Sequence, residues 1–286
     1  MRIEHIVKHE HRRVRAATTE PLWVRWLLIS IAVGFLTCFL LLPLLSIFVQ
    51  SFSDGVVVLR QSLTNPVALA AVRLTLITAA IVVPINIVFG VAAAWCLGKF
   101  EFKGKSIIIT LIDVPFAVSP VIAGLLFVFL FSTQSTMGAW LVSHNIKILY
   151  ATPAIVLATM FVTAPFVVRE LLPIMQAQGT EEELAARVLG ARGWQIFWRV
   201  TLPNIKWGLL YGAILCNARA MGEFGAVAVV SGKFRGQTLT LPLYIEAVHQ
   251  EYPKSAPFAL ASVLALLAIV TLIIKTIVEW KTQEEV

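Results

Sequence analysis

Six long runs of apolar residues constrain this chain more than any other feature of its sequence. Each run approaches or exceeds the ~20 residues that a helix needs to cross about 30 Å of hydrocarbon. Lipid offers the backbone no hydrogen-bond partners, so such runs must form helices where they span a bilayer. The predicted spans are Leu27–Val49, Val72–Leu97, Ile107–Phe131, Pro153–Leu172, Trp207–Val230 and Phe258–Val278. We therefore predict an all-α integral membrane protein with six transmembrane helices.

The overall composition agrees with a membrane protein. Of the 286 residues, 58% are hydrophobic and only 14% are charged, whereas soluble domains have about half apolar and about a quarter charged residues. The formal net charge is +7, but the basic residues flank apolar spans, which indicates membrane orientation. We expect membrane lipid around the chain and no nucleic acid bound to it.

The distribution of Lys and Arg predicts which side of the membrane each loop occupies. Most of the 23 basic residues lie in the N-terminal tail, in the loops 99–105 and 169–206, and at the C-terminal end. Loops rich in Lys and Arg stay in the cytosol, so both termini are predicted to be cytosolic. The predicted parts are a basic tail at 1–22, a transmembrane domain at 23–280 with a cytosolic loop at about 173–206, and a tail at 281–286.

Prolines interrupt several of the predicted spans, at Pro84, Pro115, Pro120 and Pro165. Each proline removes one backbone hydrogen bond and is expected to kink its helix. Proline is frequent in transmembrane helices in general. We therefore interpret these four as structural rather than functional residues.

Neither the cysteines nor the histidines predict a metal site. The three cysteines lie singly inside apolar runs and form no CxxC pair, which excludes a zinc motif; they are Cys38, Cys96 and Cys216. Three histidines lie in the basic N-terminal tail, at His5, His9 and His11. We interpret that tail as a solvated segment, because a short His tract is only compositional evidence for metal.

The most informative segment is the long loop "TEEELAARVLGARGWQIFWRVTLPN", residues 180–204. Thr180 followed by Glu183 is the pattern of a capping box, which predicts a helix beginning at Glu181. The three glutamates of its first turn complement the helix dipole. Gly190 is a suitable residue to end that helix.

A second short helix is predicted at about 193–200, and Pro203 follows where a membrane helix would begin. The loop would then expose several apolar side chains, which are Val188, Leu189, Trp194, Ile196 and Phe197. Such a surface on a polar loop usually docks onto another molecule. The alternative is that the loop packs beneath its own helices, and the residues alone favour neither interpretation.

This loop resembles the signature of ABC importer permeases, which reads Glu-Ala-Ala, three residues, Gly, nine residues, Ile, one residue, Leu-Pro. The matching positions are Ala185, Ala186, Gly190, Leu202 and Pro203. Two positions depart, because Leu184 replaces the signature glutamate and Val200 replaces the isoleucine. Glu183 stands one position early, which points its side chain about 100° away around a helix.

The resemblance implies that this loop, with Glu183 and Trp194 in it, contacts a separate cytosolic ATPase and transmits its motion to the membrane helices. ATP and Mg²⁺ would bind to that ATPase, and this chain would be neither an enzyme nor a carrier of a cofactor. The segment "GKFEFKGKS", Gly98–Ser106, is not a phosphate-binding loop. It has one residue too many between the first glycine and Gly-Lys-Ser, and it follows a membrane helix instead of a strand.

Arg219 and Glu223 are two charges near the middle of the fifth predicted span. On a continuous helix they lie one turn, or about 6 Å, apart, on a face shared with Gly212, Cys216 and Ala226. A charge at this depth costs about 2.5–3.5 kcal/mol on insertion scales, so it should face protein or water. The pair either fixes helix packing, or Arg219 contributes positive potential to an anion pathway while Glu223 prevents tight binding.

Further motifs resemble the branch of this family that imports tetrahedral oxyanions, and specifically its W-type sulfate permeases. They lie at Val83–Trp95, Asp113–Leu125, Phe161–Leu171, Ala218–Gly232 and Thr238–Glu246. The resemblance implies a bacterial inner-membrane subunit that imports sulfate or thiosulfate. Its partners would be a T-type permease, two ATPase subunits and a periplasmic sulfate-binding protein. Asn86 and Asp113 are further intramembrane polar candidates for the pathway.

Three other functions remain possible at this point. A molybdate permease would usually pair with its own copy, so a distinct second permease would argue for sulfate. A stand-alone secondary transporter would leave the loop without a partner, and its uptake would survive inactivation of the ATPase. A membrane-embedded enzyme is disfavoured because the sequence contains no HExxH or GxSxG motif.

Overall fold

The computed structural model describes residues 21–251 and 255–284, and every regular element in those stretches is a helix. In chain order they are α2 (Leu22–Leu36), the π-helical turn η1 (Thr37–Leu41), α3 (Leu42–Ser51), α4 (Val56–Thr64), α5 (Pro66–Lys99), α6 (Lys105–Ala117), α7 (Pro120–Phe131), α8 (Thr136–Ser143), α9 (Thr152–Gln178), α10 (Glu181–Val188), α11 (Gly193–Ile196), the π-helical turn η2 (Phe197–Thr201), α12 (Leu202–Met221), α13 (Gly225–Val230), α14 (Leu241–Glu251) and α15 (Ser255–Glu284). The prediction of an all-α chain is confirmed for these residues.

The N-terminal helix is a unit of its own, which ends at Val49. Its segments α2, η1 and α3 run on without a break over Leu22–Ser51, so the first predicted span is confirmed as a helix. None of the side chains in its most apolar stretch is buried. A helix that is apolar on all sides needs lipid or another protein around it.

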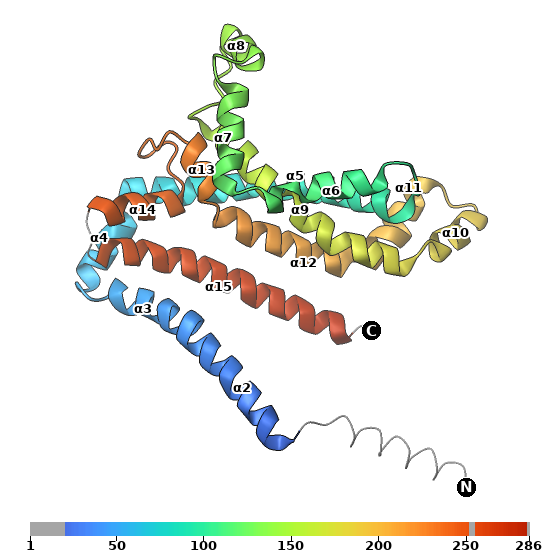
Figure 1. Cartoon of the computed structure of the whole chain (residues 1–286), viewed down its shortest axis with the longest axis horizontal. Coiled ribbons are helices and arrows are strands. Elements are labelled where there is room, and N and C mark those ends of the chain that lie inside the picture. Colours follow the sequence, from blue (N-terminus) through green and yellow to red (C-terminus); the bar gives the residue numbers. More distant parts are fainter. Residues whose placement is uncertain (1–20, 252–254, 285–286) are drawn as a thin grey trace. The chain divides into compact units, whose positions relative to one another are not determined.

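The remaining unit is built on three long helices, α5, α9 and α12 (Figure 1). Helix α5 packs along α9, and α12 packs against both. Small residues allow this close approach, since a Cβ atom on Gly90 of α5 would overlap the side chain of Val167 on α9. Pro84 and Pro165 lie inside α5 and α9, and neither proline ends its helix. Helix α15 completes the bundle by packing on α12 and α14.

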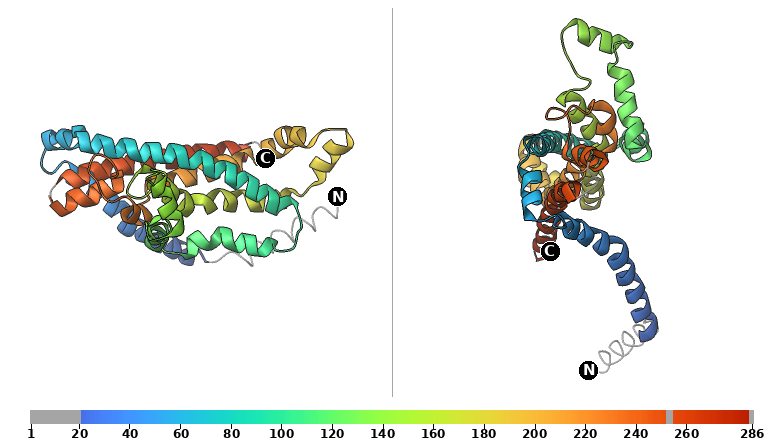
Figure 2. Two further views of the ribbon diagram at one scale, coloured as in Figure 1. Left: turned by 90° about the horizontal axis from the view of Figure 1, so that it is seen from above. Right: turned by 90° about the vertical axis from the view of Figure 1, so that its left-hand side faces the viewer.

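The third predicted span is not one straight helix. Helices α6 and α7 meet at a bend of 105°, and Figure 2 shows α7 leaving the bundle steeply while α6 runs along it. Val118 and Ser119 at the bend have extended backbones, with ψ of 132° and 136°. A residue that precedes a proline is disfavoured in the helical conformation, and Pro120 follows here, so the sequence itself places the break.

The fifth predicted span is also broken, and this prediction was wrong in an important detail. Helix α12 ends at Met221, and α13 begins only at Gly225. Arg219 therefore belongs to α12, whereas Glu223 lies in the connection between the two helices. The two residues do not share the continuous helical face that the spacing predicted.

The count of six spans is not confirmed. Within the described residues, four helices are long and apolar enough to cross a membrane, and a fifth is gained if the bent pair α6–α7 is one span. The broken pair α12–α13 is not among them. The second, fourth and sixth predicted spans correspond to α5, α9 and α15, and the helices α5 and α9 extend beyond the predicted ends.

Candidate functional site

The loop between α9 and α12 begins as the sequence predicts. Helix α10 starts at Glu181 and ends at Val188, and Gly190 has a φ of +87°, a conformation that side chains other than glycine rarely adopt. The capping box is not formed, because the Thr180 side chain makes no cap hydrogen bond. The Glu183 side chain, which the box would have used, has other partners.

Glu183 connects three helices through its carboxylate. Its Oε1 accepts a hydrogen bond from the Thr201 hydroxyl at 2.7 Å and lies 3.2 Å from Lys99 Nζ. Lys99, at the end of α5, also donates to the carbonyl of Gly179, the residue after α9. The Lys99 side chain is only 7% exposed and that of Glu183 18%. We call Lys99, Glu183, Thr201 and Gly179 the loop clamp, since together they hold α10 against the ends of α5 and α9 and against η2, the turn that leads into α12.

The second short helix of the loop is not separate from the helix that follows it. Helix α11 continues through η2 directly into α12, and Pro203 lies in the first turn of α12, as expected. Ile196 is only 6% exposed, so its predicted exposure was wrong. Phe197 is half-buried, with its ring 5.1 Å from that of Trp95 on α5.

The tip of the loop exposes an apolar surface, which we call the loop tip. Val188 and Leu189 are each 88% exposed and Trp194 is 71% exposed, as the sequence predicted. Leu184, at the position of the signature glutamate, is exposed as well. Figure 1 shows α10 and α11 at the far end of the bundle from α14. Of the other signature residues, Ala185 is exposed and Ala186 half-buried, while Leu202 packs against the core of the bundle.

Arg219 and Glu223 form an ion pair at the break between α12 and α13. Arg219 Nη1 lies 2.5 Å from Glu223 Oε2. The second carboxylate oxygen, Oε1, accepts a hydrogen bond at 2.9 Å from the backbone N–H of Ala226, in the first turn of α13. The Glu223 side chain is 1% exposed and that of Arg219 is 32% exposed. Glu223 thus stabilises the helix start and holds Arg219 at the same time.

Asn86 is buried among helices, with 1% exposure. Its amide nitrogen donates to Thr163 Oγ1 at 2.8 Å and lies 3.7 Å from Cys216 Sγ. These contacts join α5 to α9 and α12. Of the candidate pathway residues, Asn86 therefore occupies a position between helices instead of an open surface.

Asp113 has a partner that the sequence did not suggest. Its Oδ1 accepts a hydrogen bond from Arg169 Nε at 2.8 Å, and Arg169 also lies over the ring of Phe116, 4.3 Å from its centroid. The sequence placed Arg169 near the end of the fourth predicted span and also with the basic residues of the loop that follows; in the structure it lies inside α9, which continues to Gln178. The motif "FVTAPFVVREL" contains this residue, and the apolar residues Leu171 and Leu172 that follow it were the available signal that the helix continues.

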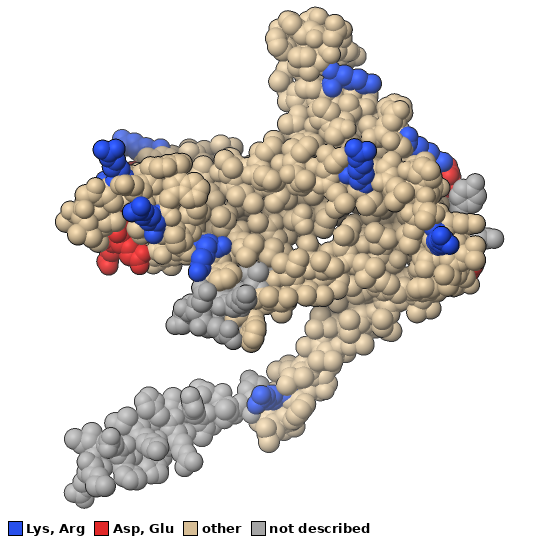
Figure 3. All heavy atoms as spheres, turned by 180° about the vertical axis from the view of Figure 1, so that it is seen from behind, with Lys and Arg blue, Asp and Glu red and all other residues tan. Residues whose placement is uncertain are grey.

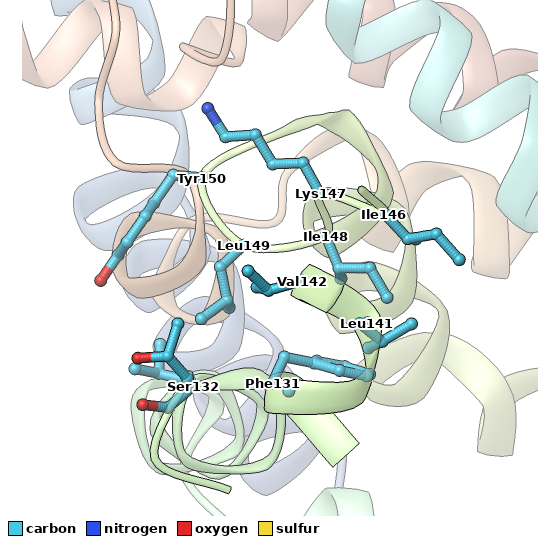
Figure 4. A pocket seen from close by; sticks show the side chains of 12 residues that line it. Phe131, Ser132, Leu141, Val142, Ile146, Lys147, Ile148, Leu149 and Tyr150 are labelled. Carbon is cyan, nitrogen blue, oxygen red and sulfur yellow. The ribbon is translucent and has the colours of Figure 1, made fainter. Parts of the chain in front are cut away.

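Charged side chains are sparse along the bundle and gather toward its ends, as the face drawn in Figure 3 shows. A cavity of about 330 Å³ lies between α7, α8 and the segment 146–150. Figure 4 shows aliphatic side chains converging on it, while the Lys147 amine extends away. Most of its lining is apolar, and its polar side chains are those of Ser132, Thr133, Lys147 and Tyr150.

No three His, Cys, Asp or Glu side chains come together as metal ligands within 21–251 and 255–284. The predicted tail with His5, His9 and His11 lies outside the described residues.

Comparison with known proteins identifies the relatives of this chain. The family described as "Binding-protein-dependent transport system inner membrane component" matches residues 86–283. The chain is 49% identical to the Sulfate transport system permease protein CysW of Escherichia coli K12, over 92% of this chain and 90% of that protein. It is 36% identical to the Sulfate transport system permease protein CysT of the same organism, over 83% of this chain and 86% of that protein.

The fold also has a counterpart among solved structures. A bacterial ABC transporter involved in the import of the acidic polysaccharide alginate contains a chain that superposes with a TM-score of 0.75. The superposition covers 99% of both chains at 16% sequence identity. At that identity the likeness concerns the fold alone.

Proposed function

Because the chain belongs to the family of binding-protein-dependent transport system inner membrane components, on its branch of W-type sulfate permeases, we propose that it forms half of the membrane channel of an ATP-driven sulfate and thiosulfate importer. It is a multi-pass inner-membrane protein and a permease subunit. ATP and Mg²⁺ would bind to a separate ATPase subunit.

The loop tip is the observation that carries this proposal. Val188, Leu189 and Trp194 are largely exposed at the end of a loop that the clamp holds to three helices. An exposed apolar surface on a firmly held support suits a contact that receives movement from a partner. We assign the ATPase contact to the loop tip, to Ala185 and Ala186 beside it, and to Gly190, whose conformation sets the turn.

The remaining assembly follows from the same relatives. The chain resembles both a W-type and a T-type permease, which supports a pair of two different permeases. Two ATPase subunits on the cytosolic side and a periplasmic sulfate-binding protein would complete the importer. The loop at 173–206 would face the ATPases, and both termini would lie in the cytosol, as the Lys and Arg distribution predicts.

The proposed anion pathway includes Arg219, whose guanidinium is held by Glu223 and one-third exposed. A fixed arginine whose charge is partly balanced attracts an anion without retaining it. Asp113 is a second pathway candidate, and Asn86 would support the pathway from within the helix contacts.

The loop tip is tested by placing a charge on it. In cells that lack this chain, the double variant Val188→Asp/Leu189→Asp should lose labelled-sulfate uptake, and its complex should lose the ATPase during purification. Phe234→Asp is the matched control: Phe234 is also exposed, at 51%, but it lies in the connection between α13 and α14. Its complex should keep the ATPase. Normal uptake by the double variant would contradict the proposal.

The turn at Gly190 gives a second test. Gly190→Trp forces a bulky side chain onto a backbone with φ of +87°. The helix end should shift, and uptake should fall to the background of cells without this chain. A variant that transports normally would show that the turn has no role in the ATPase contact.

A further inference from the structure

Arg169 is a cation on the exposed side of two apolar helices. Its side chain is 54% exposed, although it lies in α9, about 14 Å before the end of that helix at 1.5 Å per residue. A charge within an apolar span is costly in lipid, by up to about 2.5–3.5 kcal/mol at the helix centre on insertion scales. Arg169 therefore faces water or another protein in the assembled importer.

The guanidinium of Arg169 is held from one side only. Asp113 accepts from Nε at 2.8 Å, and the ring of Phe116 lies 4.3 Å from the guanidinium carbon. Phe116 is itself fixed by Phe166 of α9, with 5.1 Å between the ring centroids. The hydrogen bond to Asp113 comes from Nε and uses neither of the terminal nitrogens, Nη1 and Nη2. The two terminal nitrogens thus keep their N–H donors for a further acceptor.

Two such parallel donors match the oxygens of an oxyanion, which arginine binds in a bidentate manner. Arg169 and Asp113 also line a cavity of about 130 Å³ whose other walls are apolar, including Leu97, Ile112 and Leu172. Apolar walls strengthen the electrostatic attraction between the guanidinium and an anion. The Asp113 carboxylate reduces the net positive charge, so a bound dianion can leave again.

We propose that Arg169, positioned by Asp113 and Phe116, is an anion-binding station of the pathway, separate from Arg219 on α12. This inference rests on the proposed function and names a binding residue for the same cargo, a tetrahedral oxyanion. Arg169 supplies the hydrogen bonds. Asp113 is a positioning residue that orients the guanidinium and limits the affinity.

An anion-binding station and a structural ion pair predict different effects for variants of the two residues. If the pair only joins α6 to α9, Arg169→Gln and Asp113→Asn break the same bond and change any measured property in the same direction. In a binding station the two variants have opposite effects on anion affinity. Arg169→Gln removes the donors, whereas Asp113→Asn leaves them and removes the opposing charge.

The experiment measures sulfate protection of a cysteine beside Arg169. Ile112→Cys is introduced together with Cys38→Ser and Cys96→Ser, and the complex of both permeases and the ATPases is purified in lipid nanodiscs without the binding protein. Modification by N-ethylmaleimide, which is neutral, is followed with sodium sulfate or with sodium chloride at equal ionic strength. Sulfate should slow the modification several-fold.

Variants of Arg169 and Asp113 then show which of the two residues is responsible for the protection by sulfate. Arg169→Gln should abolish protection, Arg169→Lys should weaken it because a lysine lacks the fork, and Asp113→Asn should reach half-protection at a several-fold lower sulfate concentration. Ile146→Cys, which lines the apolar cavity near α8, is the control and should show no sulfate effect.

Three results would contradict the proposal that Arg169 binds the anion. One is an equal rate of modification of the Ile112→Cys thiol with and without sulfate, and another is the same change of protection in Arg169→Gln and Asp113→Asn. The third is the loss of the second permease from the Arg169→Gln complex, which would make Arg169 a subunit contact. Sulfate uptake by cells with the unaltered chain distinguishes this failure from failure of the proposed function, since uptake would continue in all three cases.

Discussion

Glu223 and Asp113 both pair with an arginine in the apolar part of the chain, but their surroundings differ. Glu223 is 1% exposed, and its two oxygens are used by Arg219 and by the backbone of Ala226. Asp113 is 35% exposed and reaches across to Arg169 on another helix. The same pair of chemical groups therefore fixes a backbone break in one region and presents a cation in the other.

The carboxylate of the loop clamp, Glu183, is intermediate in exposure between Glu223 and Asp113. The Glu183 side chain is 18% exposed and serves both Lys99 and Thr201. Because a buried charge left without its partner costs more than an exposed one, loss of each carboxylate should destabilise the protein in the order of its burial. The order Glu223, Glu183, Asp113 makes the comparison testable.

Replacement of Glu223 should have the largest effect. Glu223→Ala leaves Arg219 without its partner and the Ala226 N–H without its acceptor. Breaking a buried pair costs about 3–5 kcal/mol, which corresponds to a fall of about 10 °C in the thermal midpoint for a chain of this size. The measurement is the thermal midpoint of the purified complex in nanodiscs.

Glu223→Gln is the matched control, because an amide oxygen still accepts from Ala226 while the negative charge is lost. Its midpoint should lie between those of Glu223→Ala and the unaltered complex. Equal midpoints for both variants would mean that the cap on α13 contributes nothing, and would refute the interpretation of the break.

Glu183→Ala should have an intermediate effect. It removes the acceptor of Thr201 and leaves the Lys99 ammonium with the Gly179 carbonyl alone. Unsatisfied buried groups cost about 1–3 kcal/mol, and the damage is confined to the loop. We therefore expect faster amide hydrogen exchange in α10 and weaker ATPase binding.

The control for the loop clamp is Glu181→Ala, which removes an exposed glutamate of the same helical turn. It should leave hydrogen exchange in α10 nearly unchanged. If both variants loosened α10 equally, the helix dipole and not the clamp would explain the stability of the loop.

The sequence predicted the helices well because hydrophobic length and helix-end residues are local signals. The start of α10 at Glu181 and its end near Gly190 were both predicted correctly. The bend at Pro120 also has a local cause. The prolines predicted that the helices would kink, but they did not predict the angle. The count of six spans is not confirmed, and the fifth span is not the continuous helix that the spacing rule assumed, since Gly222 and Glu223 follow the end of α12 in the middle of an apolar run.

The candidate residues were predictable only where their partners are near in sequence. Arg219 and Glu223 drew attention because they are four residues apart. The bond between Asp113 and Arg169 joins α6 to α9, and the loop clamp joins α10 to η2 and to the ends of α5 and α9, so only the packing of the helices brings these groups together. Glu183 was misassigned to a capping box for the same reason: its partners, Lys99 and Thr201, are remote in sequence.

Replacement of Asp113 should have the smallest effect on stability. Exposed ion pairs contribute only about 0–1 kcal/mol, so Asp113→Asn should shift the thermal midpoint of the complex by no more than about 4 °C. Arg169→Gln is the companion variant and should change the midpoint as little, although the two should differ in sulfate protection. A fall as large as that of Glu223→Ala would show that this pair holds α6 to α9. Glu223 and Asp113 would then both have a structural role, and Asp113 would not serve to orient Arg169 for an anion.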